Sequence, residues 1–331
     1  MNKRIELRPA KDKAPELSNW GVFGEDDEIG TLNYLSPEAV LGGVSSVLLG
    51  HRYPLNLPID EPSEPVERRP RFKPDAPPFQ KTTFRINAAR SGLVVNDDHI
   101  AVATQGSSQW DAFMHVGLHE DGVDGVFYNG VTPDSVDATG RAQRNGIDKV
   151  ARVGIAGRGV LIDIARMVSG GGSEPLPSGH EITTGETAAC LQRQGSEIRE
   201  GDIVCFRTGW TETYMESDQA GRALLMAPEE GGALPAVAGI NPDHAEMAYE
   251  QRWAAVAADN AGVELLPMEE PTKSAHVRMM RNLGLPFGEL LLFRDLSEAC
   301  ASDGRYEFFF VAVPMWIPGG MGSPANAMAI R

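Results

Sequence analysis

Short apolar runs alternate with segments of helical spacing through the middle and C-terminal parts of the chain. Residues 160–164 and 203–207 are apolar runs with β-branched side chains, whereas 188–195 and 244–255 combine helical spacing with good helix formers. Residues 308–313, FFFVAV, give the clearest strand signal. Alternation of this kind predicts an α/β fold, in which helices cover the faces of a β-sheet.

Two further buried runs, 254–258 and 262–266, are separated by Asp259 and Asn260, which predict a turn. Nearer the N-terminus, Ser36 stands before a proline and predicts the start of a helix, with the serine as N-cap. Residues 61–80, EPSEPVERRPRFKPDAPPFQ, are too rich in proline and charge for a helix or a central strand. We expect an extended surface loop or arm there.

The segment 104–115, TQGSSQWDAFMH, concentrates amides, a carboxylate and an imidazole at short spacing. It follows an apolar run at 100–103 that predicts a short strand, and glycine-rich turns come after it. Asp111 and His115 are four residues apart, so on a helical turn they would face the same side. Such a group of side chains is typical of a catalytic or metal-binding site.

This segment resembles the motif H-x-G-T-H-x-D-x-P-x-H of the metal-dependent cyclase/hydrolase family, which includes bacterial kynurenine formamidase and isatin hydrolase. On that motif Asp111 matches the metal-ligand aspartate and His115 the catalytic histidine that follows it. Gln105 and Gln109 stand where the family has its two metal-binding histidines, and Phe113 replaces the proline. The chain is therefore expected to be a variant member with altered ligands.

A downstream segment, SAHVRMMRNLGLPFGELLLFRDL, is similar to the family segment that completes the metal site with a histidine and a glutamate. The matching residues are His276 and Glu289. The resemblance implies that Asp111, His276 and Glu289 bind one divalent metal, zinc or manganese, with an open position for water. Gln109 would add a neutral amide oxygen as a weaker ligand.

The resemblance covers most of the chain, continuing through GIAGRGVLIDIAR, EGDIVCFRTGW and the C-terminal YEFFFVAVPMWIPGGMGSPANAMAI. It implies a mixed β-sheet curled into a barrel-like core with flanking helices, the swivelling β/β/α type. No linker divides the sequence, so we predict a single domain over 1–331, with 1–80 as an N-terminal extension and proline-rich arm. In longer family members such an extension lies over the site.

Four side chains are candidates for substrate contacts, each with a structural alternative. Gln105 would touch substrate or metal, or only satisfy neighbouring backbone groups. Trp110, Phe113 and Trp20 would form aromatic pocket walls; packing in the core is the more common role of any one aromatic residue.

The reaction implied is hydrolysis of an amide or lactone in a small cyclic or aromatic substrate by metal-activated water, with His115 moving protons to the leaving group. Two alternatives stay open, because glutamines replace two imidazole ligands. One is a non-hydrolytic lyase or cyclase that uses His115 as acid and base. The other is a catalytically silent member that binds a small molecule.

Other enzyme classes fit the sequence less well. The glycine-rich GIAGRG at 154–159 precedes a strand instead of opening a helix, so it lacks the helix N-terminus of a dinucleotide site. No G-x-S-x-G elbow is present for a serine hydrolase. A metal-activated water is the better nucleophile.

Charge and cysteine content restrict the partners. The net charge of −16 and the pI near 4.9 argue against nucleic acid and anionic membranes, which leaves a small-molecule substrate. Cys190, Cys205 and Cys300 lack C-x-x-C spacing and are expected to be reduced core residues, as in a cytoplasmic protein. Neither an apolar signal region nor a membrane-length apolar run is present. The arm and the family pattern favour a homodimer or homotetramer.

Overall fold

A nine-stranded mixed sheet forms the centre of the computed structural model, which describes residues 14–62, 79–88, 92–120, 122–227, 235–268 and 270–331. Four neighbouring strands run parallel, and the remaining pairs are antiparallel. In sheet order the strands are β1 (Arg52–Pro54), β15 (Ala327–Ile330), β13 (Glu307–Ala312), β7 (Ile155–Ile162), β9 (Ile203–Phe206), β11 (Ala255–Ala258), β12 (Phe287–Glu289), β4 (Gln109–Asp111) and β14 (Gly322–Pro324).

The order of the last two strands shows that the sheet is curled. β15 is second and β14 ninth, so in a flat sheet seven spacings of about 4.8 Å would separate them by about 34 Å. Yet Pro324 and Ala327 are only three residues apart, a span of at most about 11 Å. Leu55, the residue after β1, connects β15 with the segment that follows β12. Its N–H donates to Ala327 O (3.0 Å), and its carbonyl accepts from the Leu292 N–H (2.9 Å). The predicted barrel-like α/β core is confirmed.

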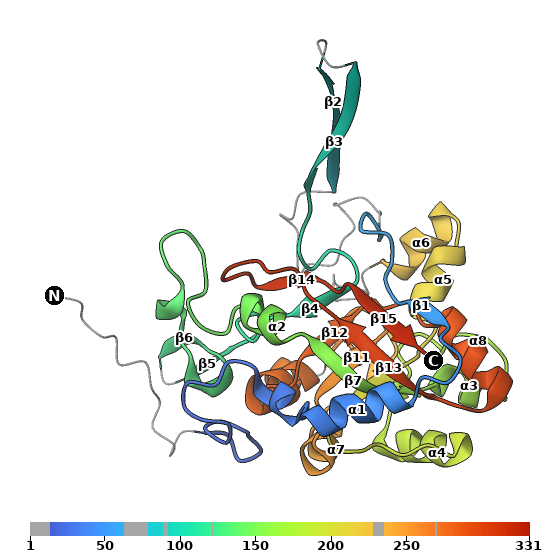
Figure 1. Ribbon diagram of the computed structural model, residues 1–331. Helices are drawn as coiled ribbons and strands as arrows, with labels where there is room; N and C mark the ends of the chain where they lie inside the picture. The colour runs from blue at the N-terminus through green and yellow to red at the C-terminus, as the bar shows by residue number, and fades with distance from the viewer. Residues whose placement is uncertain (1–13, 63–78, 89–91, 121, 228–234, 269) are drawn as a thin grey trace.

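Helices flank this sheet (Figure 1). The predicted start at Ser36 is confirmed, because its hydroxyl accepts from the Ala39 N–H (3.2 Å) and the helix packs closely on β7. No helix in these residue ranges is long and apolar enough to cross a membrane. The α-helices are α1 (Pro37–Ser45), α2 (Ile147–Val153), α3 (Ile164–Val168), α4 (Thr184–Gln194), α5 (Trp210–Glu216), α6 (Gln219–Leu225), α7 (His244–Gln251) and α8 (Arg294–Asp303).

Two hydrophobic clusters cover the two faces of the sheet. Along β9, Ile203 and Cys205 belong to one cluster, while Val204 and Phe206 belong to the other, as the two-residue period of a strand requires. All three cysteines are free and buried, as expected. Because side chains alternate in this way, a polar residue beside a core residue on a short strand faces the opposite side of the sheet.

Most of the predicted elements occur with shifted bounds. Residues 308–313 form β13, and 160–164 contain the end of β7 and the start of α3. The run at 262–266 is largely buried, as expected, but it forms only isolated bridges, such as Glu264 with Ile240. The expected strand at 100–103 is instead the end of a longer strand that stops at Ala101.

That longer strand belongs to a hairpin outside the main sheet. β2 (Gln80–Ala88) and β3 (Leu93–Ala101) pair in antiparallel register and project away from the body (Figure 1). The proline-rich stretch before it falls mainly on residues 63–78, outside the described residues. Smaller two-stranded sheets are formed by β5 (Leu118–Glu120) with β6 (Val123–Val126) and β8 (Glu181–Ile182) with β10 (Gly239–Ile240).

Candidate metal centre and pocket

Two neighbouring strands bring the predicted carboxylates together. β4 pairs with β12 so that Gln109 lies opposite Glu289, and Gly322 of β14 lies opposite Asp111 on the other side. Trp110, between the two polar residues of β4, packs in the hydrophobic core. Alternation along β4 therefore places Gln109 and Asp111 on the same face as Glu289.

The imidazole comes from a different segment. His276 begins a π-helical turn (His276–Arg281), and its Nε2 lies 3.2 Å from Glu289 Oε1 and 3.7 Å from Asp111 Oδ2. Its Nδ1 makes a short contact with the buried carboxylate of Glu264. Asp111, His276 and Glu289 are buried, and one ligand atom of each lies within 4.8 Å of the others. The structure thus brings together the three main ligands predicted from sequence.

The electrostatics of this cluster favour a cation among the carboxylates. Burial raises the pKa of Asp111, but the charges of His115 and His276 and hydrogen bonds from His276 and Gln105 lower it on balance. Burial lowers the pKa of His276, yet the charge of Glu264 and hydrogen bonds to the carboxylates, Asp111 included, raise it well above its ordinary value. A positive charge at this position is therefore stabilised by its surroundings.

The two glutamines point at the same carboxylates. Gln105 Nε2 donates to Asp111 Oδ1, while Gln109 Nε2 donates to Glu289 Oε2 (2.6 Å) and more weakly to Asp111 Oδ1 (3.4 Å). Gln109 Oε1 is buried without a hydrogen-bond donor among the described residues, and buried Asp111 Oδ2 has no contact among them shorter than the 3.7 Å to His276 Nε2. Buried oxygens of this kind normally have a partner, and a divalent cation is one that suits oxygen atoms. The donor set fits a metal.

His115 reaches the site from a turn and not from a helix. Asp111 ends β4, and the His115 N–H donates to Ala112 O (2.8 Å) in the turn that follows. The two residues therefore do not lie on one helical turn, although both side chains still face the site. The His115 side chain is exposed and lines the pocket described next.

A cavity of about 470 Å³ opens beside the cluster. Its polar end is formed by Gln105, Gln109, His115, His276 and Glu289. The rest of its described wall is mainly apolar and consists of Pro62, Val116, Leu118, Trp210, Met226, Leu266, Met268, Pro271, Val277 and Leu290, with small residues between them. The shape and lining are typical of a site for a small, largely apolar molecule.

The three aromatic residues expected at the pocket wall pack elsewhere. Trp110 is fully buried and meets Phe310 edge-on at 6.1 Å. Phe113 packs on Tyr128 at 5.0 Å. The indole N–H of Trp20 donates to Arg281 O (2.9 Å), beside the hydrophobic core. These side chains are not among those that line the pocket, so the packing alternative describes them better.

Sequence reasoning missed Trp210, the one aromatic residue in the described lining, and Glu264, which contacts His276. Trp210 stacks on Tyr214 at 5.5 Å with nearly parallel rings. Its position just beyond the carboxyl end of a parallel strand is a usual place for ligand contacts and was the available signal. Glu264 lies in no recognised motif, so no sequence signal pointed to it.

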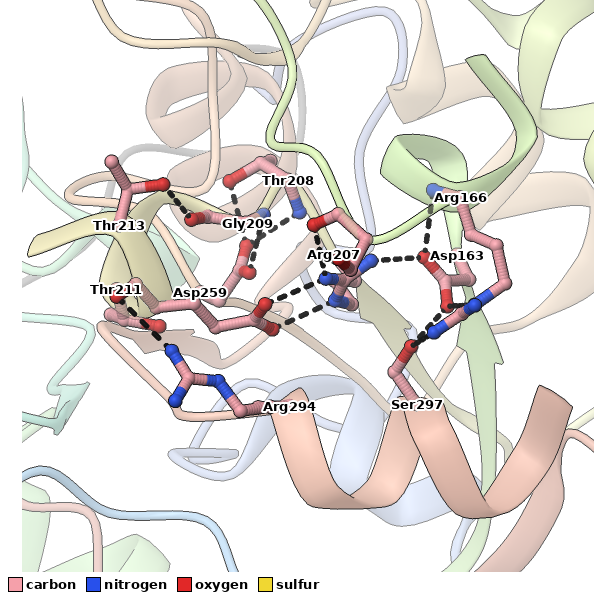
Figure 2. Close-up of polar contacts among 12 residues, drawn as sticks. Asp163, Arg166, Arg207, Thr208, Gly209, Thr211, Thr213, Asp259, Arg294 and Ser297 are labelled. Carbon is pink, nitrogen blue, oxygen red and sulfur yellow. Dashed lines mark hydrogen bonds and ion pairs between the residues drawn. The ribbon is translucent and has the colours of Figure 1, made fainter. Parts of the chain in front are cut away.

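Buried polar side chains hold the turn that leads to Trp210 (Figure 2). Arg207 donates to Asp163 Oδ1 (2.8 Å) and to Glu212 Oε2 (2.6 Å). Asp259 accepts from the N–H groups of Thr208 (2.6 Å) and Gly209 (2.7 Å). Burial and the charge of Glu212 raise the pKa of Asp259 to about 7. The carboxyl ends of β7, β9 and β11 are thus linked into one rigid edge behind the pocket wall.

Comparisons with known proteins agree with this architecture. Residues 49–265 match the model of the family described as "Putative cyclase". A crystal structure of a novel cyclase has 34% sequence identity and a TM-score of 0.80, covering 96% of this chain and 100% of that chain. Isatin hydrolase A from Labrenzia aggregata, bound to benzyl benzoate, has 20% identity and a TM-score of 0.60, with 90% and 98% covered. The enzyme of the same name from Ralstonia solanacearum has 19% identity and a TM-score of 0.58, with 85% and 92% covered. No curated protein matches the sequence.

Proposed function

The chain belongs to the cyclase family, and from this premise we propose that it is a metal-dependent hydrolase that opens an amide or lactone bond in a small cyclic or aromatic substrate. One observation carries the proposal. Asp111, His276 and Glu289 converge in one buried cluster, and two of them, His276 and Glu289, line a pocket whose other walls are mainly apolar. Such a site can hold both a metal and the carbonyl end of an apolar substrate.

Asp111, His276 and Glu289 would hold the metal. One nitrogen and two or more oxygen donors suit zinc and manganese. A half-turn of the Gln109 amide would exchange its oxygen and nitrogen and so offer a further oxygen donor. When bound, the metal supplies Lewis acidity, which lowers the pKa of a water and polarises the substrate carbonyl.

His115 is the side chain placed to move protons. It lines the pocket near Asp111 without being one of the three buried ligands, and it is open to solvent. An imidazole can take the proton of the attacking water and return it to the departing nitrogen or oxygen near neutral pH. One residue can therefore both accept and return the proton that hydrolysis transfers.

The apolar walls of the pocket determine which kind of substrate group is bound next to the carbonyl that is hydrolysed. Trp210, Leu266 and Met226 present carbon surface, which favours an aromatic or cyclic hydrocarbon group. The isatin hydrolase A of Labrenzia aggregata binds benzyl benzoate, a two-ring ester, and another isatin hydrolase binds the product analogue thioisatinate. The walls here suit ligands of that class.

The proposal is tested on protein purified without a histidine tag or chelators. Elemental analysis should find one zinc or manganese per chain, and a panel of aryl formamides, lactams and lactones should contain a substrate whose hydrolysis releases acid. Asp111→Asn should abolish both metal and turnover. Protein that takes up neither metal, and hydrolyses no member of the panel, would contradict the proposal.

A silent binding protein is the second candidate, and a specific observation favours it. The Gln105 and Gln109 amides already donate to the carboxylates that would hold the metal. On this alternative, metal-free protein would be stabilised against heat by benzyl benzoate while converting none of it. Turnover that depends on added metal would exclude this candidate.

A further inference from the structure

One apolar part of the pocket lining, which we call the Trp210 wall, comes from three segments that are far apart in the sequence. It comprises Trp210 at the start of α5, Met226 at the end of α6, and Pro62 in the segment after β1. Trp210 and Met226 pack in one hydrophobic cluster with Tyr214. A wall assembled from three segments keeps its shape only if contacts behind it hold the segments together.

A stack of two rings and a guanidinium lies behind the pocket surface of this wall. The ring of Tyr214 packs on the Trp210 indole with the two planes 12° apart, and Arg222 Cζ lies 4.8 Å from the centre of the Tyr214 ring. Arg222 also joins α6 to α5, its neighbour in Figure 1, because its Nε donates to Ser217 O (3.1 Å) and its Nη2 to Met215 O (3.3 Å). A charged side chain thus supports the indole from behind.

Glu61 connects this stack to the third segment of the wall. Its Oε1 accepts from Arg222 Nη1 (3.0 Å), and its Oε2 accepts from the Tyr214 hydroxyl (3.1 Å). The side chains of Glu61 and Arg222 are only 16% and 20% exposed, so water and salt screen their attraction incompletely. Glu61 directly precedes Pro62. One carboxylate therefore holds Pro62 close to the residues that support Trp210.

The segment that carries Glu61 is fixed at its other end beside the candidate metal centre. Ser108 Oγ accepts from the Leu57 N–H (2.8 Å), and Ser107 Oγ donates to Pro58 O (3.0 Å). The two serines directly precede β4, which carries two side chains of the metal centre. Because these contacts do not involve Glu61, loss of its carboxylate should loosen the Trp210 wall and leave the metal centre in place.

We propose that Glu61 and Arg222 are positioning residues, which fix the Trp210 wall and thereby the affinity of the pocket for the apolar part of a ligand. Neither side chain is in the described lining, so both act through Trp210 and Pro62. The inference rests on the proposed function in that it takes this pocket as the substrate site. It adds that substrate affinity depends on an ion pair outside the pocket, whereas metal affinity does not.

The first test needs neither ligand nor turnover. It measures quenching of Trp210 fluorescence by acrylamide, as the difference between each protein and the same protein with Trp210→Phe. Glu61→Ala and Arg222→Gln should each raise the quenching constant about twofold or more, because the indole loses its support. The double variant should not exceed the larger single effect, since both changes remove one contact. Glu200→Ala, which breaks an exposed pair with Arg252 (3.1 Å), should have no effect.

The second test measures the affinity of metal-free protein for benzyl benzoate by fluorescence titration. Glu61→Ala and Arg222→Gln should each raise the dissociation constant by about 3- to 5-fold, as expected for loss of one partly buried ion pair. Zinc affinity, measured by competition with a chelator, should stay at the wild-type value. For any substrate that the wild type hydrolyses, KM should rise by the same factor while kcat is unchanged.

Thermal melts establish that each variant is folded, and Glu61→Gln replaces Glu61→Ala if the latter is not. Wild-type quenching in both single variants would overturn the inference. So would additive effects in the double variant, an equal change in Glu200→Ala, a rise in quenching without loss of ligand affinity, or zinc affinity that falls in step with it. Wild-type protein that binds no benzyl benzoate would contradict the ligand class proposed above, and the quenching measurement would then decide the present inference alone.

Discussion

Glu264 is the residue that fixes how His276 is presented to the carboxylates of Asp111 and Glu289. Its buried carboxylate contacts His276 Nδ1 and also accepts from the Ala275 N–H (2.5 Å). With Nδ1 engaged, Nε2 is directed toward Asp111 and Glu289. A carboxylate behind a metal-binding histidine sets its tautomer and raises its basicity as a ligand.

Glu264→Gln should therefore weaken metal binding without removing a ligand. We expect the dissociation constant for zinc or manganese to rise about 10- to 100-fold. Competition against a chelator of known affinity measures it. Glu270→Gln changes an exposed carboxylate of the same region and should leave the affinity unchanged. Equal affinity in the two variants would show that Glu264 is only structural.

Substitution of the proposed ligands themselves should have a larger effect on metal content. Asp111→Ala and Glu289→Ala should each lose bound metal, because each removes one of two carboxylates from a three-residue set. His119→Ala should retain it, since that side chain is 69% exposed and pairs loosely with Asp124. Elemental analysis of the three variants measures their metal content. Normal metal content in both Asp111→Ala and Glu289→Ala would show that the metal site is elsewhere.

Substitution of the two glutamines, in contrast, should strengthen metal binding. Gln105→His with Gln109→His restores the family motif at two positions whose side chains already contact the carboxylates of Asp111 and Glu289. Imidazole is a stronger ligand than an amide, so affinity for zinc should rise by about tenfold or more. Calorimetric titration measures this change. An unaltered affinity would mean that neither side chain turns toward the metal.

Motif matching was sufficient to select Asp111, His276 and Glu289, which the fold places in one cluster, because spacing along the chain carried the information. It failed for Trp110, since one residue separates the two faces of a strand and the motif does not state which face is buried. The role of Glu264 could not be predicted from the sequence, for another reason. Its role depends on a contact with His276 that only the folded chain creates.

Among the elements, α4 and α7 are joined through a buried histidine. His244, the first residue of α7, is fully buried, and its Nε2 lies 2.9 Å from the Thr187 hydroxyl of α4. Its Nδ1 lies 2.9 Å from Asn241 Oδ1. Burial lowers the pKa of His244 to about 4, despite the hydrogen bond from its ring to Asn241. The contact between the helices thus uses a neutral imidazole.

This contact predicts sensitivity to acid. Between about pH 6.5 and pH 4 the unfolded state binds a proton at His244 that the folded state does not, so the free energy of unfolding falls as pH falls. Between pH 7 and 5 the loss should be about 2 kcal/mol greater in wild type than in His244→Gln. Urea unfolding at the two pH values measures it. His119→Asn serves as the control, and identical pH slopes in wild type and His244→Gln would contradict the prediction.

The sequence pattern was informative for elements that are buried on one or both sides. β13 and β9 were located within one or two residues, because their apolar runs reflect burial directly. The hairpin was not predicted as such, since a strand with exposed polar and apolar residues lacks a burial pattern. Its polar sequence NDDH at 96–99 obscured β3.

At the scale of the whole molecule, charge opposes the homodimer that the family resemblance favours. Each chain carries a formal net charge of −16, so two chains repel one another at long range. Added salt screens this repulsion over about 8–10 Å at physiological strength while leaving apolar contacts intact. The dissociation constant should fall several-fold between 20 and 200 mM sodium chloride in sedimentation equilibrium. A rise with salt would indicate that ion pairs hold the interface.

The curled sheet also orders events during synthesis. β4, which carries Asp111, emerges in the first third of the chain, but its two neighbours in the sheet are β12 and β14, near the C-terminus. A ribosome therefore makes nearly the whole polypeptide before β4 has any strand to pair with. On the proposed metal site, uptake of metal would report completion of the fold, because a nascent chain that stops short of residue 287 carries Asp111 and His276 but lacks Glu289 and both strands that pair with β4.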